Sequence, residues 1–160
     1  MTSLDGDYDV LEQAIGQLLR LNSSRKVHAR FAAAAGVVMS QPASVLLRRI
    51  DEHGPLSLGE AAALTHMDPA ATGRQIKQLE RDGLVQREPS EIDKRVTVVR
   101  ATRQGAALSR RLSKVAQQHL QDTLASWSAS DRNALAELLS RLVDDLRMNR
   151  YRDAADEAAG

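Results

Sequence analysis

Apolar residues recur at three- and four-residue steps along most of the chain. Between residues 7 and 35 this spacing predicts one long N-terminal helix that ends near Gly36. A second helix is expected over residues 40–54, with Pro42 at a tolerated first-turn position. The segments 102–127 and 128–146 show the same periodicity and predict two further helices. The chain is therefore expected to be mainly α-helical.

The pattern changes in the middle of the chain. A short extended segment at residues 55–58 precedes two short helices, expected at about 59–65 and 69–83. Residues 84–87 and 96–100 favour β-structure, and they flank a polar stretch, which predicts an antiparallel hairpin with a projecting loop. Two short helices joined by a tight turn and followed at once by a hairpin describe a winged helix-turn-helix.

The helix expected at about 69–83 has two contrasting faces. At 100° per residue, the buried side is made of Thr72, Ile76, Leu79 and Gly83. The opposite side is made of Ala70, Ala71, Arg74, Lys77, Gln78 and Arg81, with Gln75 at its edge. Arginine and lysine can donate to guanine, glutamine can pair with adenine, and alanine can touch a thymine methyl in the major groove. An ordinary solvated helix face has a similar composition, so this face alone leaves both interpretations open.

The loop of the expected hairpin contains Asp93, Lys94 and Arg95. An exposed arginine suits the narrow minor groove, whose negative potential attracts guanidinium groups. Asp93 is expected to orient Arg95 through a charge-assisted hydrogen bond. The alternative is a charged turn with no further role.

The charge distribution changes the picture that total charge gives. The formal net charge is only +1, which by itself argues against a nucleic-acid binder. Residues 72–114, however, sum to +6, whereas residues 1–23 and 115–160 sum to −3 each. A basic middle between acidic ends is the distribution expected of a DNA-binding lobe on an acidic base.

Composition removes several classes of function. The chain has no cysteine, which excludes disulfides, cysteine-ligated zinc and thiol sensing, and only 2 % aromatic residues, which argues against a base-stacking platform. The histidines lack the spacing of a helical metal pair, and there is no phosphate loop or nucleophile elbow. We therefore expect no metal, no cofactor and no enzymatic activity. Without a long apolar run or a signal-peptide pattern, we expect no membrane association and a cytoplasmic location.

The run from Asp93 to Gly105, DKRVTVVRATRQG, resembles the MarR-type winged helix-turn-helix transcriptional regulators. Their pattern is Asp-x-Arg, several residues of a strand, then Leu-Thr-x-x-Gly at the start of a helix. The matching positions here are Asp93, Arg95, Thr102 and Gly105. Residues 54–60 and 74–87 also resemble the family, and the resemblance spans about residues 11–146. The family often has Leu where Ala101 stands, and Ser or Thr where Ala70, Ala71 and Gly73 stand.

The resemblance implies a homodimer that binds a near-palindromic operator in double-stranded DNA, most often as a repressor. It implies an N-terminal dimerisation helix at 1–36, a DNA-binding lobe at 37–101, C-terminal dimerisation helices at 102–150 and a flexible tail at 151–160. Within the lobe, the recognition helix is expected at about 69–83 and the wing at about 84–101. The apolar stripes of the last two helices independently favour a dimer, because they exceed what one small lobe can cover. An intramolecular helix pair is the alternative.

The resemblance also implies a small-molecule pocket between the dimerisation helices and the lobe, often for a phenolic or aromatic anion. The candidate effector-binding residue is His28, with Arg25, Arg48 and Arg49 as further candidates. A surface or hydrogen-bonded structural histidine is the favoured alternative for His28. Two other functions stay open for the whole chain: a helical protein-interaction module without DNA binding, and a small-molecule-binding protein without regulatory output.

Overall fold

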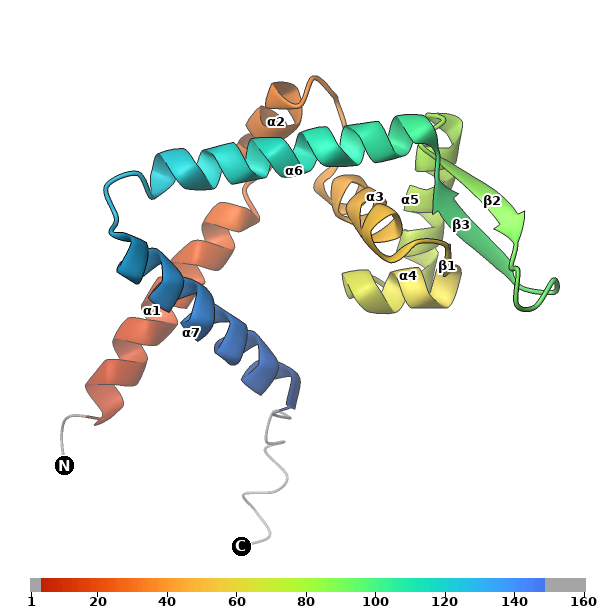
Figure 1. Cartoon of the computed structure of the whole chain (residues 1–160). Coiled ribbons are helices and arrows are strands. Elements are labelled where there is room, and N and C mark those ends of the chain that lie inside the picture. Colours follow the sequence, from red (N-terminus) through yellow and green to blue (C-terminus); the bar gives the residue numbers. More distant parts are fainter. Residues whose placement is uncertain (1–3, 149–160) are drawn as a thin grey trace, which may run out of the picture. The chain divides into compact units, whose positions relative to one another are not determined.

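The computed structural model describes residues 4–148 and divides into two compact units, Met1–Gln118 and His119–Gly160 (Figure 1). The first unit contains α1 (Leu4–Asn22), α2 (Arg25–Ala34), α3 (Gln41–His53), β1 (Leu56–Ser57), α4 (Leu58–Thr65), α5 (Pro69–Arg81), β2 (Val85–Pro89) and β3 (Thr97–Ala101). Helix α6 (Arg103–Thr123) begins in the first unit and ends in the second, which also contains α7 (Ala129–Met148). The expected class, mainly α with a small β wing, is confirmed.

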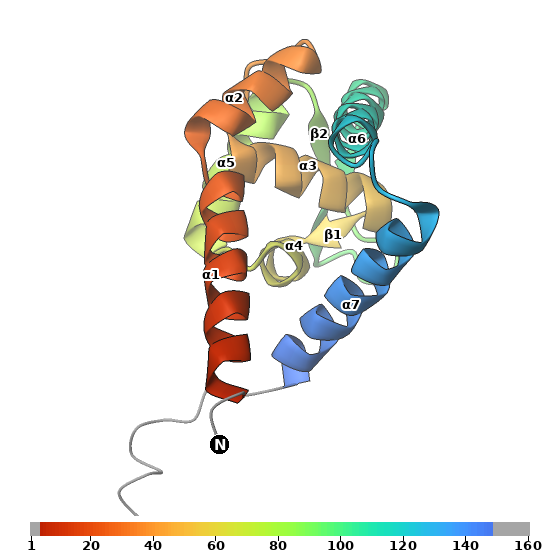
Figure 2. The same cartoon turned by 90° about the vertical axis from the view of Figure 1, so that its left-hand side faces the viewer.

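Helices α3, α4 and α5 pack around one apolar core (Figure 2). Leu46, Leu47 and Ile50 of α3 meet Ile76 and Leu79 of α5, and each of these side chains is at most 1 % exposed. The inward positions on α5 follow the helical period that the sequence predicted. The core fixes which face of α5 remains outside.

Local hydrogen bonds define the start of α4 and the turn that joins α4 to α5. Ser57 and Glu60 form a capping box at the start of α4, in which the Ser57 N–H donates to Glu60 Oε2 at 2.7 Å. His66 ends α4 in the left-handed region at φ 53°. Asp68 then caps α5, because its Oδ1 accepts from the Ala71 N–H at 2.7 Å. His66 and Asp68 thus end α4 and begin α5 within three residues.

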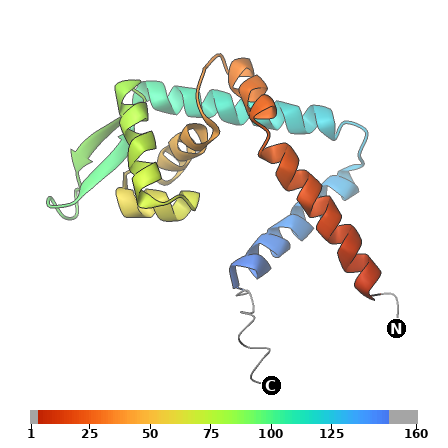
Figure 3. The same ribbon diagram turned by 180° about the vertical axis from the view of Figure 1, so that it is seen from behind.

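The sheet is antiparallel, with strand order β1-β3-β2. In the wing, Val85 pairs with Ala101 at the base and Pro89 with Thr97 near the loop. The hairpin extends past α5 in the view of Figure 3. It therefore places its loop at the outer end of the lobe.

Helix α6 docks on the lobe through its first turns. Thr102 Oγ1 accepts from the Gly105 N–H at 3.0 Å and donates to the Gly83 carbonyl at 2.7 Å. Gly105, Leu108 and Leu112 are buried beside this junction. The Thr-x-x-Gly motif thus joins the wing, the end of α5 and the start of α6.

Three expectations about element boundaries were wrong. The single N-terminal helix expected within residues 1–36 is two helices, because the chain turns at Ser23 and Ser24 Oγ caps α2 by accepting from the Val27 N–H. Gly83 lies after α5, is exposed and has φ +70°, so it does not belong to the buried face. Helix α6 ends at Thr123, so Trp127 lies beyond it. The tail expected at 151–160 lies outside the described residues.

Much apolar surface is uncovered within the single chain. Helix α7 buries none of its described residues, although Leu138, Leu139, Val143 and Leu146 lie along it. Helix α1 likewise exposes Val10, Leu11 and Leu18. Within residues 4–148, no helix combines the length and apolarity needed to cross a membrane.

Candidate nucleic-acid interface

The outward face of α5 is basic and open to solvent. Ala70, Arg74, Lys77, Gln78 and Arg81 are exposed, whereas Ala71 and Gln75 are half-buried. On the other side of the helix, Thr72 is buried. Its hydroxyl donates to the Asp68 carbonyl at 2.9 Å, so this buried polar group has a hydrogen-bond partner. The structure therefore places the predicted recognition residues on one continuous side of a firmly anchored helix.

Helix α5 is tied to the start of α3. Ser40 Oγ donates to Gln75 Oε1 at 3.3 Å and, as the cap of α3, accepts from the Ala43 N–H. A hollow of about 460 Å³ lies between the two helices, with Ser40, Arg74 and Arg81 among its lining residues. The hollow brings two guanidinium groups to one edge of the basic face.

The polar end of Gln78 is fully engaged in the free protein. Its Nε2 donates to both carboxylate oxygens of Asp82, at 2.9 and 3.1 Å, and its Oε1 accepts from Arg81 Nη2 at 2.7 Å. Gln78 is thus part of a three-residue network at the end of α5. The sequence analysis did not predict this network, although its residues have the i,i+3 and i,i+4 spacing that brings side chains together on a helix.

The wing loop is held by its own hydrogen bonds. Ser90 Oγ accepts from the Ile92 N–H at 3.2 Å, and the Ser90 N–H donates to the Val96 carbonyl at 2.8 Å. Asp93 Oδ1 accepts from the backbone N–H of Arg95 at 2.9 Å. The sequence predicted a bond from Asp93 to the Arg95 guanidinium; the bond in the structure instead shapes the backbone. Lys94 and Arg95 are exposed.

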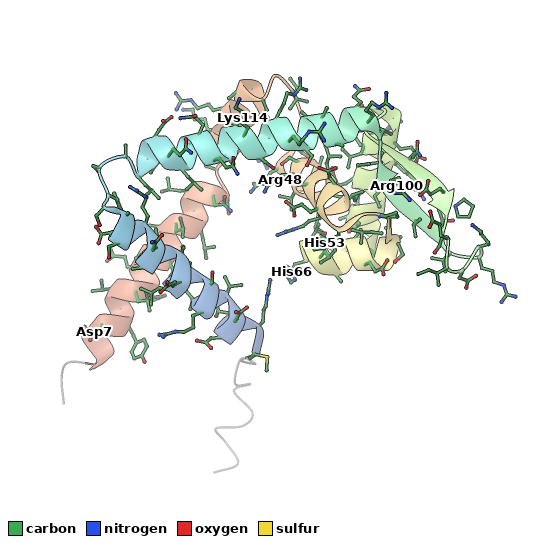
Figure 4. The ribbon with its side chains drawn as sticks, viewed as in Figure 1. Asp7, Arg48, His53, His66, Arg100 and Lys114 are labelled. Atoms are coloured by element: carbon green, nitrogen blue, oxygen red, sulfur yellow. The ribbon has the colours of Figure 1, made fainter. Side chains whose placement is uncertain are left out.

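A charged brace that the sequence analysis missed stiffens the wing. Arg100 of β3 bonds Glu88 of β2 through Nε and Oε1 at 2.7 Å, and its Nη2 lies 3.8 Å from Glu91 (Figure 4). Arg87 of β2 bonds Glu80 of α5 at 3.1 Å. Diagonal neighbours on one face of a hairpin interact, so correct register would have revealed the first pair. These three ion pairs connect the loop, the two strands and α5.

His28 is a half-buried residue of α2. Its Nε2 is 3.2 Å from the Met39 carbonyl, and its ring is 6.1 Å from that of Phe31. Of the other candidates, Arg49 bonds Glu52 at 2.9 Å and Arg48 lies 3.6 Å from the same carboxylate. His28 and Arg49 have hydrogen-bond partners within the protein, whereas the buried Nε of Arg48 has none among the described residues.

Comparison with known proteins agrees with this geometry. The model of the MarR family matches residues 39–97, from just before α3 to the first residue of β3. The transcriptional repressor NicR of Pseudomonas putida is 31 % identical over 137 residues, covering 86 % of both chains. The chain belongs to the MarR family. It is accordingly a DNA-binding transcriptional regulator and not an enzyme.

Further relatives and solved structures are similar to this chain. The uncharacterised regulator YdgJ of Bacillus subtilis is 29 % identical, covering 77 % of this chain and 74 % of its own length. The structure of a probable transcriptional regulator from Pseudomonas aeruginosa is 29 % identical, with a TM-score of 0.61, covering 82 % of this chain and 98 % of its own. Reduced MarR from E. coli shares the fold at 24 % identity and a TM-score of 0.64, covering 80 % and 95 % of the two chains.

Proposed function

We propose that this MarR-family protein is a homodimeric repressor of a near-palindromic operator. Each protomer inserts α5 into a major groove and its wing into the adjacent minor groove. The observation on which the proposal rests is the basic outward face of α5, anchored by its buried stripe and adjoining a wing with an exposed Lys94-Arg95 tip. A major groove admits one helix, and the second helix of the pair is the one presented.

The proposed major-groove residues divide by chemistry. Arg74 and Lys77 are exposed donors for guanine O6 and N7, and Gln78, the residue after Lys77, is exposed on the same side of the helix. Ala70 and Ala71, at the start of α5, let the backbone approach closely. Gln75 is half-buried against Ser40, so it serves at the edge of the contact.

The proposed minor-groove residues are Lys94 and Arg95. The ammonium group of Lys94 and the guanidinium group of Arg95 match the negative potential of a narrow groove. Asp93 contributes indirectly, because its bond to the Arg95 N–H fixes the turn that presents the Arg95 side chain. The brace from Arg100 to Glu88 limits motion of the hairpin below this turn.

Dimerisation is proposed through the segments 1–36 and 102–150, with residues 37–101 as the DNA-binding lobe. An amphipathic helix that buries none of its described residues in its own chain supports a partner for α7. A symmetric pair of identical chains is the commonest way to cover such a surface. Two lobes related by a two-fold axis would read two half-sites one helical turn apart.

The repressor role and its release are proposals of the same kind. NicR, a relative that aligns with 86 % of this chain, is a repressor. Release by a small phenolic or aromatic anion requires that the ligand bind the DNA-free form more tightly, since only differential affinity shifts the equilibrium. Binding of salicylate with unchanged DNA affinity would instead indicate a small-molecule-binding protein without regulatory output.

Titration of selected DNA tests the proposal. We would select duplexes from a randomised library with the wild-type protein and measure affinity by gel shift over a range of salt. Arg95→Ala should weaken binding by about 1–3 kcal/mol with the dimer still folded. Hydroxyl-radical footprints should show two protected half-sites.

Two results would contradict the proposal. Wild-type affinity of Arg95→Ala would remove the wing from the interface. Absence of a steep fall of affinity with salt would favour the helical protein-interaction module, because phosphate contacts release counterions and make binding salt-dependent.

A further inference from the structure

The hydrogen-bond network of Gln78, Arg81 and Asp82 at the end of α5 indicates a role for Gln78 that its exposed position on the helix does not. An amide that reads adenine must offer both its oxygen and its nitrogen to the base. In Gln78 the nitrogen is bonded to both oxygens of Asp82, and the oxygen is bonded to Arg81. Gln78 is therefore placed to support a neighbour.

The neighbour is Arg81, which is exposed and retains unused donors. A guanidinium has five N–H groups in a fixed fork, and the structure uses one Nη2 bond for Gln78. A long side chain that is already oriented loses less freedom when it binds. The network therefore holds Arg81 ready for an external acceptor.

The position of Arg81 indicates which acceptor. The 13-residue α5 is about 20 Å long at about 1.5 Å per residue, whereas the major groove is about 12 Å wide. When the first turns of α5 lie in the groove, its last turn lies beside the sugar-phosphate backbone. Arg81 is in that last turn.

The surrounding charge favours a phosphate. Two guanidinium residues, Arg74 and Arg81, line the same hollow as one carboxylate, Asp82, so the positive charge is in excess there. Gln78 Nε2 bonds both oxygens of that carboxylate. A phosphate oxygen is matched by a guanidinium fork in both charge and geometry. We propose that Arg81 binds a phosphate of the DNA backbone and that Gln78, anchored by Asp82, is the residue that positions it. This proposal rests on the DNA-binding surface proposed above.

Fluorescence anisotropy with a labelled duplex, selected by the wild-type protein from a randomised library, provides the test. Arg81→Ala should raise Kd about tenfold at low salt and reduce the slope of log K against log salt by about 0.9 per lost contact, or about 1.8 for a dimer. The base preference in a repeated selection should not change. Arg110→Ala, which removes the same charge from an exposed site on α6, should stay within about twofold of wild type.

The role of Gln78 is tested by combining variants. Gln78→Ala should raise Kd several-fold in the otherwise wild-type protein. In the Arg81→Ala background the same change should alter Kd less than about twofold, because Gln78 then has no arginine to position. Melting followed by circular dichroism should be unchanged in all variants, because both side chains are exposed.

The outcomes separate this proposal from the one beneath it. An unchanged salt slope in Arg81→Ala, while Arg74→Ala and Arg95→Ala weaken binding, overturns the role of Arg81 and leaves the DNA-binding surface intact. A changed base preference in Gln78→Ala shows that Gln78 reads a base and overturns its positioning role. Wild-type affinity of Arg74→Ala, Arg81→Ala and Arg95→Ala together overturns both proposals.

Discussion

At the scale of single residues, one glycine determines how α6 meets the lobe. A Cβ added at Gly105 would overlap the Leu84 carbonyl oxygen and lie 3.3 Å from Leu47 Cδ1. A carbon atom cannot overlap a backbone oxygen in this way, so α6 would have to move. Thr102 is tied to the same carbonyl, since its N–H donates to Leu84 O at 3.0 Å. The Thr-x-x-Gly motif therefore has a packing reason as well as a capping one.

Replacement of two glycines should change stability in opposite directions. Gly105→Ala should lower the free energy of unfolding by about 1–3 kcal/mol, because the added methyl cannot be accommodated without moving α6. Gly73→Ala should raise it by about 0.5–1 kcal/mol, because a Cβ there meets only Leu58 Cδ1 at 4.0 Å and alanine is the better helix former. Urea unfolding of the two variants measures both signs. Equal stability of Gly105→Ala and wild type would show that the junction has room to adjust.

At the scale of elements, the sequence predicted what short-range signals determine. The caps at Ser57 and Asp68 placed α4 and α5 within a residue or two, because each cap bonds a backbone N–H three residues away. The break at Ser24 was missed, because apolar steps continue across both N-terminal helices. The brace from Arg100 to Glu88 was missed because it joins residues 12 apart and depends on strand register. The helix caps could be predicted from the sequence, whereas a side-chain pair that depends on strand register could not.

The capping box at α4 predicts a pH dependence. Hydrogen bonds from the Ser57 hydroxyl, first, and from its backbone N–H hold the pKa of the Glu60 carboxyl below its ordinary value. A carboxyl with a lowered folded-state pKa stabilises the fold above its unfolded pKa and loses that contribution as pH falls through the folded pKa. Because this carboxyl is exposed and solvent screens its interactions, Glu60→Ala should be less stable than wild type by only about 0.5 kcal/mol at pH 7.

The difference in stability between Glu60→Ala and the wild type should shrink as the pH is lowered below the ordinary range of glutamate pKa values. Thermal unfolding at pH 7 and at successively lower pH measures it. A difference that stays constant with pH would mean that the Glu60 charge contributes nothing and that only its packing matters.

At the scale of the whole molecule, charge and apolar surface are separated along the chain. The basic excess is concentrated in residues 72–114, which include most of α5 and the whole wing. The uncovered apolar residues of α1 and α7 lie instead in the two acidic segments, 1–23 and 115–160. A net charge of +1 concealed this division. It matches one surface for a polyanion and another for a second copy of the chain.

This separation of basic and apolar surfaces predicts that a change in the apolar surface of α7 weakens both dimerisation and DNA binding. Leu138 is 58 % exposed in the single chain, so Leu138→Glu should cost the isolated protomer little. In a dimer it would place a carboxylate in an apolar contact, which is costly when unpaired. Analytical ultracentrifugation should show a shift from dimer to monomer. Affinity for a two-half-site duplex should fall about 100-fold, because the second lobe no longer binds as part of the same molecule.

A matched control and a second DNA separate this effect from a direct loss of DNA contacts. Asn133→Glu adds the same charge to an exposed polar position of α7 and should remain dimeric with wild-type affinity. On a duplex with a single half-site, Leu138→Glu should bind nearly as well as wild type, since only one lobe contacts the DNA in either case. Sedimentation of Leu138→Glu as a wild-type dimer would contradict dimerisation through α7. Loss of half-site binding in the monomer would instead mean that association shapes the lobe itself, a coupling that the caps and the buried core of the lobe argue against.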